Sequence, residues 1–185
     1  MSPISLKRSM SILSNTTDSN SVAVSLGSNL PYLNRSPREI VLAAIQSLRS
    51  ISIEAEASSL YLSEPIDCPL GTGDFINAAM ILRLSSKISA SELLAVLQGI
   101  EADYGRARSA EQNQARTLDI DIISYGNQVL ESAHLILPHP RAAQRRFVLM
   151  PLVEIHPEMV LPGQSENIAQ LLDFLPRIEN VHLLA

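Results

Sequence analysis

Two helix starts of the same kind constrain the fold more than any other feature of this sequence. Ser36 and Ser89 are each followed three residues later by a glutamate, Glu39 and Glu92, which is the capping-box pattern of a helix N-terminus. The apolar stripes that follow are Ile40, Ala44, Ile45 and Leu48 in the first segment, and Leu93, Leu94, Leu97 and Ile100 in the second. This spacing predicts one helix that ends near residue 50 and another that ends at residue 105.

Four strand-like runs surround these two helices. Apolar residues alternate in them with small or polar ones, and glycine, proline and asparagine mark the turns between them. The runs cover residues 21–26, 51–61, 75–84 and 117–125. The order β-α-β-β-α-β predicts an α+β fold, a ferredoxin-like antiparallel sheet with helices packed on it. The remainder is a C-terminal addition, in which Pro151 should make any helix over 145–155 short or kinked.

Length and composition bound the class of protein. A chain of 185 residues with 46% hydrophobic content can bury one proper core, so we expect residues 21–185 to form a single domain. Cys68 has no second cysteine to pair with, and no apolar run is long enough to cross a bilayer, which favours the cytoplasm and no membrane partner. The net charge of −5 argues against nucleic acid as a partner.

Residues 1–20 differ in composition from the rest of the chain. They are rich in serine, carry Lys7 and Arg8, and contain no acid before Asp18. Because such a segment cannot bury a core, we expect a disordered N-terminal extension. An organellar transit peptide has a similar composition, but no arginine-rich amphipathic pattern supports that alternative.

The stretch 117–123 carries the most informative chemical signal. Strand side chains alternate between two faces, so Asp119 and Asp121 share one face while Leu118, Ile120 and Ile122 share the other. Two carboxylates this close repel each other unless a cation neutralises them. Mg²⁺ commonly takes one or two protein carboxylates and completes its shell with water and substrate phosphates. The ordinary alternative is a solvated strand face that carries two acids.

Charged neighbours favour the metal interpretation. Glu101, Arg106, Arg108 and Arg116 flank the paired acids, and guanidinium groups can bind phosphate oxygens through two hydrogen bonds. This combination indicates transfer of a phosphorus-containing group from ATP. The sequence contains neither a P-loop nor a complete G-x-G-x-x-G motif, so side chains rather than a glycine cradle must hold the nucleotide.

Aromatic residues make up only 4% of the chain, which draws attention to Phe75 and Phe147. Phe75 precedes Asn77 by two positions, so a strand would place the ring and the amide on one face. A ring that stacks on a flat heterocycle and an amide that binds its edge would form a recognition pair. A core phenylalanine with a strand-end asparagine is the ordinary alternative. His139, between two prolines, is either a loop histidine or a donor to phosphate.

Taken together, these residues resemble the 6-hydroxymethyl-7,8-dihydropterin pyrophosphokinase family of folate biosynthesis. The match covers residues 22–162 and rests on landmarks that occur in family order. They are Val24-Ser25-Leu26-Gly27-Ser28-Asn29-Leu30, residues 61–65, Asp74-Phe75-Ile76-Asn77-Ala78, Ile100-Glu101, Gly105-Arg106, Arg108, Arg116-Thr117-Leu118-Asp119-Ile120-Asp121-Ile122, Pro138-His139-Pro140-Arg141, Arg145 and Phe147. No single landmark is decisive, but together and in order they are highly specific.

The resemblance implies transfer of the β,γ-pyrophosphoryl group of ATP to the hydroxymethyl oxygen of a reduced pterin, with release of AMP. It implies that Asp119 and Asp121 bind two Mg²⁺ ions and that Arg106 and Arg116 neutralise charge on the transferred group. The pterin site that it implies consists of Ser63, Pro65, Ile66, Phe75, Asn77 and Phe147. The ATP site that it implies consists of Gln98, Glu101, Arg108, Ile122, His139 and Arg145. Other enzymes of the folate pathway are further candidate partners.

The loop between Arg106 and Arg116 departs from the family pattern. Gln112, Asn113, Gln114 and Ala115 stand where members commonly carry a basic residue, an aromatic residue, and a glycine and a proline before the arginine. Two rivals therefore remain: a family member that binds pterin but turns over poorly, and a ferredoxin-like module that binds a ligand and regulates a partner without catalysis. Formation of AMP from ATP, Mg²⁺ and the reduced pterin separates the three.

Overall fold

The computed structural model describes residues 19–106, 115–177 and 179–184, and these ranges alternate between strands and helices. The elements are β1 (Ser21–Ser28), α1 (Pro37–Ile51), β2 (Glu54–Ala57), β3 (Tyr61–Ser63), β4 (Phe75–Arg83), α2 (Ala90–Asp103), β5 (Asp119–Tyr125), β6 (Leu130–Glu131), β7 (Ile136–Leu137), the 3-10 turn η1 (Ala142–Gln144), α3 (Arg146–Ile155), α4 (Ile168–Phe174) and β8 (Val181–Leu183). In the part of the chain so described, no helix has the length and apolar character needed to span a membrane.

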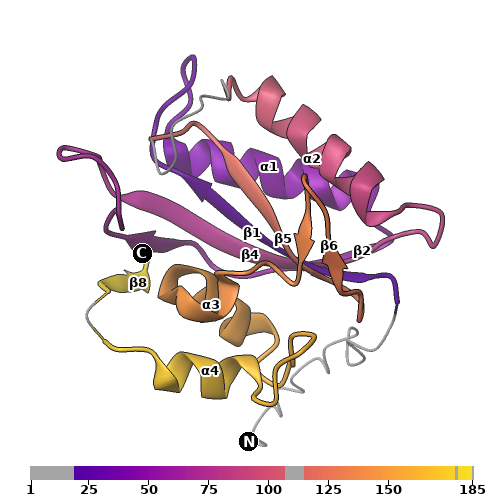
Figure 1. Ribbon diagram of the computed structural model, residues 1–185. Coiled ribbons are helices and arrows are strands. Elements are labelled where there is room, and N and C mark those ends of the chain that lie inside the picture. The colour runs from indigo at the N-terminus through magenta and orange to yellow at the C-terminus, as the bar shows by residue number, and fades with distance from the viewer. Residues whose placement is uncertain (1–18, 107–114, 178, 185) are drawn as a thin grey trace, which may run out of the picture.

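One antiparallel sheet organises the fold (Figure 1). Its strand order is β5-β1-β4-β3-β8, and β2 pairs with β4 beside β3. β1 therefore lies between β5 and β4. Across the sheet, the four predicted strands follow the ferredoxin-like order, which is the fourth (β5), the first (β1), the third (β4) and the second (β2 and β3). The predicted α+β class is confirmed, and the C-terminal addition contributes the end strand β8.

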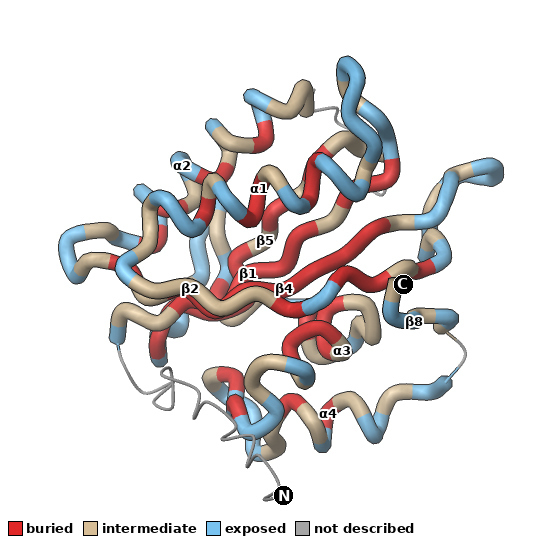
Figure 2. The backbone as a smooth tube through the Cα atoms, turned by 180° about the vertical axis from the view of Figure 1, so that it is seen from behind, coloured by how far each residue is buried: buried red, intermediate tan, exposed pale blue. Residues whose placement is uncertain are grey.

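Helices cover both faces of this sheet. α1 and α2 lie on one face, and α3 and α4 lie on the other (Figures 1 and 2). On β4, Ala78 and Met80 pack toward α1 and α2, whereas Ala79 and Ile81 pack toward α3 and α4. Because side chains alternate along a strand, the even or odd position of a residue decides which of the two cores it joins.

Both predicted capping boxes are present. Glu39 N–H donates to Ser36 Oγ at 3.4 Å, and Ser36 N–H donates to Glu39 Oε2 at 2.8 Å. Ser89 and Glu92 make the same pair of contacts at 3.2 and 2.8 Å. Each pair satisfies N–H groups that the first turn of a helix otherwise leaves unpaired.

The predicted strand over residues 51–61 is instead two short strands, β2 and β3. Ser58 separates them, because its N–H donates to Ala79 O and its Oγ accepts from Ala79 N–H, each at 2.9 Å. A side-chain oxygen thus replaces a backbone acceptor at this point, and the regular strand is interrupted.

The first described segment begins at residue 19, within the predicted N-terminal extension. Residues 1–18 lie outside the described residues, whereas Ser19 and Asn20 form a turn before β1. Asn20 O accepts from Leu84 N–H at 3.0 Å. Asn20, which the prediction assigned to the extension, is therefore joined to the sheet. The predicted helix over 145–155 is α3, a short helix of ten residues that contains Pro151.

Candidate active site

A pocket of about 360 Å³ lies on the face of the sheet that α3 covers. A row of paired residues crosses its floor, because Gly27 of β1 lies opposite Asp119 of β5 and opposite Asn77 of β4. Two strand spacings separate Asp119 from Asn77, or about 10 Å. The absence of a side chain at Gly27 leaves the space between the carboxylate and the amide open.

The lining of the pocket comes from segments that are far apart in sequence. It consists of Ser25, Leu26, Gly27, Ser63, Glu64, Ile66, Asp67, Cys68, Phe75, Asn77, Arg116, Asp119, Asp121, Arg141, Gln144, Arg145, Phe147 and Glu179. Asp119 and Asp121 lie on the β5 side of Gly27, Phe75 and Asn77 lie on the β4 side, and the Arg145 guanidinium lies over the Phe147 ring, 5.3 Å from its centroid.

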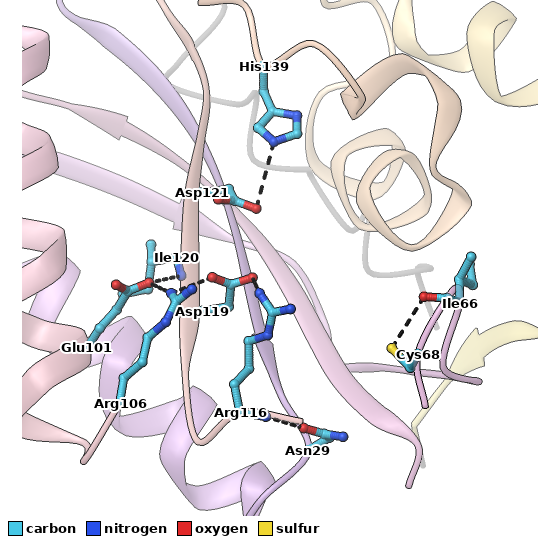
Figure 3. A network of polar contacts seen from close by, with 10 residues as sticks. All are labelled: Asn29, Ile66, Cys68, Glu101, Arg106, Arg116, Asp119, Ile120, Asp121 and His139. Atoms are coloured by element: carbon cyan, nitrogen blue, oxygen red, sulfur yellow. Dashed lines mark hydrogen bonds and ion pairs between the residues drawn. The ribbon is translucent and has the colours of Figure 1, made fainter. Parts of the chain in front are cut away.

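Asp119 is held by two arginines that approach it from opposite sides (Figure 3). Arg116 Nη1 lies 2.5 Å from Asp119 Oδ2, and Arg106 Nη1 contacts Asp119 Oδ1. Arg106 also pairs with Glu101 at the end of α2. The charges of Asp119 and Glu101 raise the pKa of Arg106 against the opposing effect of burial, so this guanidinium stays charged.

Glu101 supports the site from behind. Only 3% of it is exposed, and its Oε1 accepts from Arg106 and from Ile120 N–H, the latter at 2.8 Å. The carboxylate therefore joins α2 to β5 and fixes Arg106 at the same time. Such charge-assisted hydrogen bonds are stronger than neutral ones, which explains how a carboxylate can be buried here.

Asp121 and His139 form a second pair beside Asp119 (Figure 3). Withdrawal from water and then the charge of Asp119 raise the pKa of Asp121, although 41% of its side chain is exposed to the pocket. Burial and then the charge of Arg145 lower the pKa of His139 to about 4, so its imidazole is neutral near pH 7. Its Nδ1 accepts from Arg141 N–H at 3.2 Å, so Nε2 carries the proton. Nε2 lies 4.0 Å from Asp121 Oδ2 and can donate to an anion.

The donor set fits Mg²⁺. Within the described residues no group of three or more His, Cys, Asp or Glu side chains could hold a metal ion. Asp119 and Asp121, which both line the pocket from β5, would be the protein's share of the ligands. One or two carboxylates in an open pocket suit Mg²⁺ when phosphate oxygens supply the remaining positions. Withdrawal from water and then repulsion by Asp119 raise the pKa of Asp121, and a bound cation would offset both effects.

The other end of the pocket suits a flat ligand. Asn77 is 3% exposed, and its Nδ2 donates to Ser63 Oγ at 2.9 Å and to Phe75 O at 3.3 Å. Its Oδ1 lies toward Gly27, where it can accept from a ligand N–H. Phe75 and Phe147 line the same pocket from β4 and α3. Two rings and an amide acceptor are what recognition of a polar heterocycle requires.

Most of the predicted site residues converge on this pocket. Those that line it are Ser63, Ile66, Phe75, Asn77, Arg116, Asp119, Asp121, Arg145 and Phe147. Arg106 contacts Asp119, and Glu101 contacts Arg106 and the Ile120 N–H. His139 lies beside Asp121, and Pro65 stands between the lining residues Glu64 and Ile66.

Three predicted ATP-site residues have other outcomes: one lies away from the pocket, one could offer only its backbone, and one lies outside the described residues. Gln98 is half-buried on α2 and does not line the pocket. The Ile122 side chain belongs to the core beneath α1 and α2, on the face opposite Asp121, so only its backbone could contribute to a ligand site. Arg108 lies outside the described residues, as do Gln112, Asn113 and Gln114.

Asn29 is a supporting residue that the sequence analysis did not single out. Its Oδ1 accepts from Arg116 N–H at 2.7 Å, and its Nδ2 donates to Gly73 O at 3.2 Å. Asn29 and Leu30 also donate their N–H groups to Arg116 O, at 3.1 and 3.2 Å. Asn29 thus joins three loops around the pocket. The available signal was its place in the first sequence landmark, directly after the strand that ends at Ser28.

Arg141, Gln144 and Glu179 also line the pocket without having been assigned a role. Arg141 was visible as part of a sequence landmark, and it extends the cationic end toward Arg145. Glu179 gave no signal, because it lies in the C-terminal addition outside every motif.

The fold and the pocket together define a class of protein. Paired carboxylates with guanidinium groups at one end, and aromatic rings with an amide at the other, suit an enzyme that transfers a phosphate-type group to a flat organic substrate. A family model described as 7,8-dihydro-6-hydroxymethylpterin-pyrophosphokinase (HPPK) matches residues 23–157. The chain belongs to this family, and the resemblance read from its motifs is confirmed.

Individual relatives agree with this assignment. A 2-amino-4-hydroxy-6-hydroxymethyldihydropteridine pyrophosphokinase of Synechocystis sp. is 40% identical over 151 residues, which cover 81% of this chain and 73% of the relative. An enzyme of the same name from Haemophilus influenzae is 36% identical over 151 residues, covering 80% and 89%. Wild-type Plasmodium falciparum HPPK-DHPS, in a crystal structure with pteroate, has a TM-score of 0.60 at 14% identity. That comparison covers 83% of this chain and 42% of the longer one, and it shows the fold alone.

Proposed function

We propose that this protein transfers the pyrophosphoryl group of ATP to the hydroxymethyl oxygen of 6-hydroxymethyl-7,8-dihydropterin and releases AMP, as a step of folate biosynthesis. The observation that carries the proposal is that one pocket contains both halves of the required site. Asp119, Asp121 and Arg116 form the half for phosphates, and Phe75 and Asn77 belong to the half for a heterocycle. Membership of the pyrophosphokinase family supports the same reaction.

The arginines are placed to receive a phosphate group. Arg106 and Arg116 converge on one carboxylate, so their side chains are ordered before any ligand enters. Each guanidinium has five N–H donors and can bind Asp119 and a phosphate oxygen together. Charge on the departing pyrophosphoryl group would then meet donors whose positions are already fixed.

Asp119 and Asp121 would hold Mg²⁺, and we propose two ions with ATP as co-substrate. When bound, the Mg²⁺ would neutralise charge on the triphosphate and make the β-phosphorus easier to attack. His139, neutral with its proton on Nε2, would donate to an ATP oxygen near Asp121. Arg145, whose pKa is lowered by burial and then by the charge of Arg141, would neutralise the same part of the nucleotide.

The aromatic half would orient the acceptor. Phe75 and Phe147 would stack on the pterin, while Asn77 Oδ1 accepts from a ring N–H. Gly27 leaves room for the hydroxymethyl group to extend along the floor toward Asp119. Holding the hydroxyl oxygen next to the β-phosphorus converts an encounter in solution into a reaction within one complex. Ser63, Pro65 and Ile66 complete the proposed pterin site.

The remaining ATP contacts stay predictions. Gln98, Glu101, Arg108 and the Ile122 backbone are the candidates for the adenosine end. Ile122 belongs to β5, which is an end strand of the sheet, so one side of its backbone faces away from β1. Partnership with other folate enzymes and a cytoplasmic location also stay predictions.

The identity of the nucleotide product tests the proposal. The protein is incubated with ATP, Mg²⁺ and 6-hydroxymethyl-7,8-dihydropterin, and nucleotides and pterins are separated by chromatography. AMP and pterin diphosphate should appear in equal amounts and only with Mg²⁺. ADP with a pterin monophosphate would refute the assignment. Pterin binding without AMP would favour the weakly active rival, and neither binding nor turnover would favour a regulatory module.

A further inference from the structure

The C-terminal segment beyond the family match reaches back to the pocket. The match ends at residue 157, and α4 and β8 follow it. β8 pairs with β3, the strand that carries Ser63, with Val181 opposite Ser63. In Figure 1, β8 (yellow) lies beside α3 at the edge of the sheet. Glu179, two residues before β8, therefore lines the same pocket as Phe147.

The first turn of α3 has no capping side chain from its own N-cap. Arg145 occupies that position without a side-chain hydrogen bond, and the first turn contains no acid. Glu179 supplies a partner from the C-terminal segment, because Arg146 N–H donates to Glu179 Oε2 at 3.0 Å. An acceptor oxygen at this end of a helix satisfies an N–H group that the helix itself leaves unpaired.

The side chain of Arg146 attaches the same turn to α4. Its Nη1 donates to Leu172 O and Leu175 O, each at 3.3 Å. Residues on both sides of Arg146 belong to the candidate active site. Arg145 has an anchor of its own, since its N–H donates to Ala142 O at 3.3 Å. Phe147 follows Arg146 directly, so its backbone position depends on the turn that Glu179 holds.

We infer that Glu179 is a positioning residue of the pterin site, which fixes the first turn of α3 and thereby the place of the Phe147 ring. The inference rests on the proposed function, because stacking of the pterin on Phe147 is part of it. Through Glu179, the segment beyond residue 157 would contribute to substrate recognition. Glu179 acts through its hydrogen bond to Arg146 rather than through its charge, and this distinction makes the inference testable.

Three variants and one control separate these effects. Glu179→Ala removes the acceptor, Glu179→Gln keeps an acceptor oxygen without the charge, and Glu179→Asp keeps the charge on a shorter side chain. Asp173→Ala, an exposed carboxylate on α4, is the control. The KM values for pterin and ATP and the kcat are measured by AMP formation. The Kd of 6-hydroxymethylpterin is measured separately by its fluorescence, without ATP.

Glu179→Ala should raise the KM and Kd for the pterin about tenfold, which is the factor expected if the stability that a helix cap contributes is lost from the complex. The KM for ATP and the kcat should change less than the pterin Kd, because the backbone of Arg145 keeps its own anchor although its guanidinium lies over the Phe147 ring. Glu179→Gln and the control should resemble the wild type, and Glu179→Asp should lie between Gln and Ala. If Glu179→Gln weakens pterin binding as much as Glu179→Ala does, or if both KM values rise together, the inference is wrong.

A double-mutant cycle tests the route through the ring. In a Phe147→Leu background, Glu179→Ala should change the pterin Kd by less than about threefold, since the ring that it positions is gone. A full tenfold effect there would show that Glu179 acts elsewhere. If Glu179→Ala fails to fold, the cycle is run with Glu179→Asp, and additivity again overturns the inference. The wild type tests the proposed function in the same series: without AMP, the reaction is refuted, while the binding data still decide the role of Glu179.

Discussion

Gly27 offers a sharp test of how the pocket is used, because one methyl group there would stand on its floor. A Cβ at this position would lie 3.4 Å from Asn77 Oδ1 and 3.9 Å from Phe75 Cδ1, which are ordinary contacts. Gly27 has regular strand backbone in β1, so alanine is compatible with its conformation. Alanine in a strand should even stabilise the fold, by about 0.5–1 kcal/mol relative to glycine.

Gly27→Ala should therefore weaken the binding of the substrate rather than the stability of the fold. The methyl group would crowd a ligand that approaches Asn77 Oδ1 from the pocket, which should weaken one hydrogen bond by about 1 kcal/mol. Crowding of a well-packed site costs roughly 1–2 kcal/mol more. The sum of about 2–3 kcal/mol corresponds to a rise of roughly 30- to 160-fold in the Kd for pterin.

The assay compares Gly27→Ala with Gly99→Ala. An added Cβ at Gly99, on α2, meets nothing within 4 Å, so this control should keep wild-type kinetics and gain about 1 kcal/mol of stability. Pterin Kd is measured by fluorescence, the KM for ATP by AMP formation, and unfolding by urea. Wild-type pterin affinity in Gly27→Ala would refute the proposed path of the ligand past Gly27, between Asn77 Oδ1 and Asp119. A rise confined to the KM for ATP would show that the two ends of the pocket are assigned the wrong way round.

Three other changes test the rest of the site. Asp121→Asn should fold normally but lower turnover roughly a thousandfold by removing a metal-binding charge, and near-normal activity in limiting Mg²⁺ would contradict the ligand assignment. Glu101→Leu should lower the free energy of unfolding by about 2–4 kcal/mol, since Arg106 and the Ile120 N–H lose a buried acceptor; urea denaturation should show a smaller loss for Glu101→Gln. Deletion of residues 1–18 should leave turnover unchanged, and a large loss of activity in a folded truncation would show that this segment contributes to the site.

Local signals were enough to predict α1, α2 and the division of the strand faces, whereas α4 was not predicted. A capping box forms within four consecutive residues, so Ser36 and Ser89 predict the starts of their helices without information from the rest of the chain. The opposite faces of Asp119 and Ile120 follow from the strand period alone, and the structure confirms them. Ile122 shows the reverse case: the same period already placed its side chain away from the acids, although the resemblance put it in the ATP site.

Contacts between distant segments were beyond such reasoning. Ser58 interrupts a strand only because Ala79 of β4 offers both of its backbone groups. Asn29 supports Arg116 across 87 residues of sequence, and Glu179 holds Arg146 across 33. No local pattern encodes these pairs, because the folded sheet creates them by bringing separate loops to one edge.

The alternation of side chains across the sheet has a consequence for how this protein can evolve or be engineered. Even-numbered positions of β4 and of the first part of β5, such as Met80 and Ile120, pack toward α1 and α2, while the acids and Asn77 occupy odd-numbered positions. Beyond the register shift of β5, Tyr125 joins the layer under α1 and α2 as well. Substitutions that repack the first layer can therefore adjust thermal tolerance without placing a new atom in the pocket. Substitutions that alter ligand recognition, by contrast, should accumulate at the odd positions that face the pocket. The stability that they cost can be offset by better packing on the opposite face of the sheet.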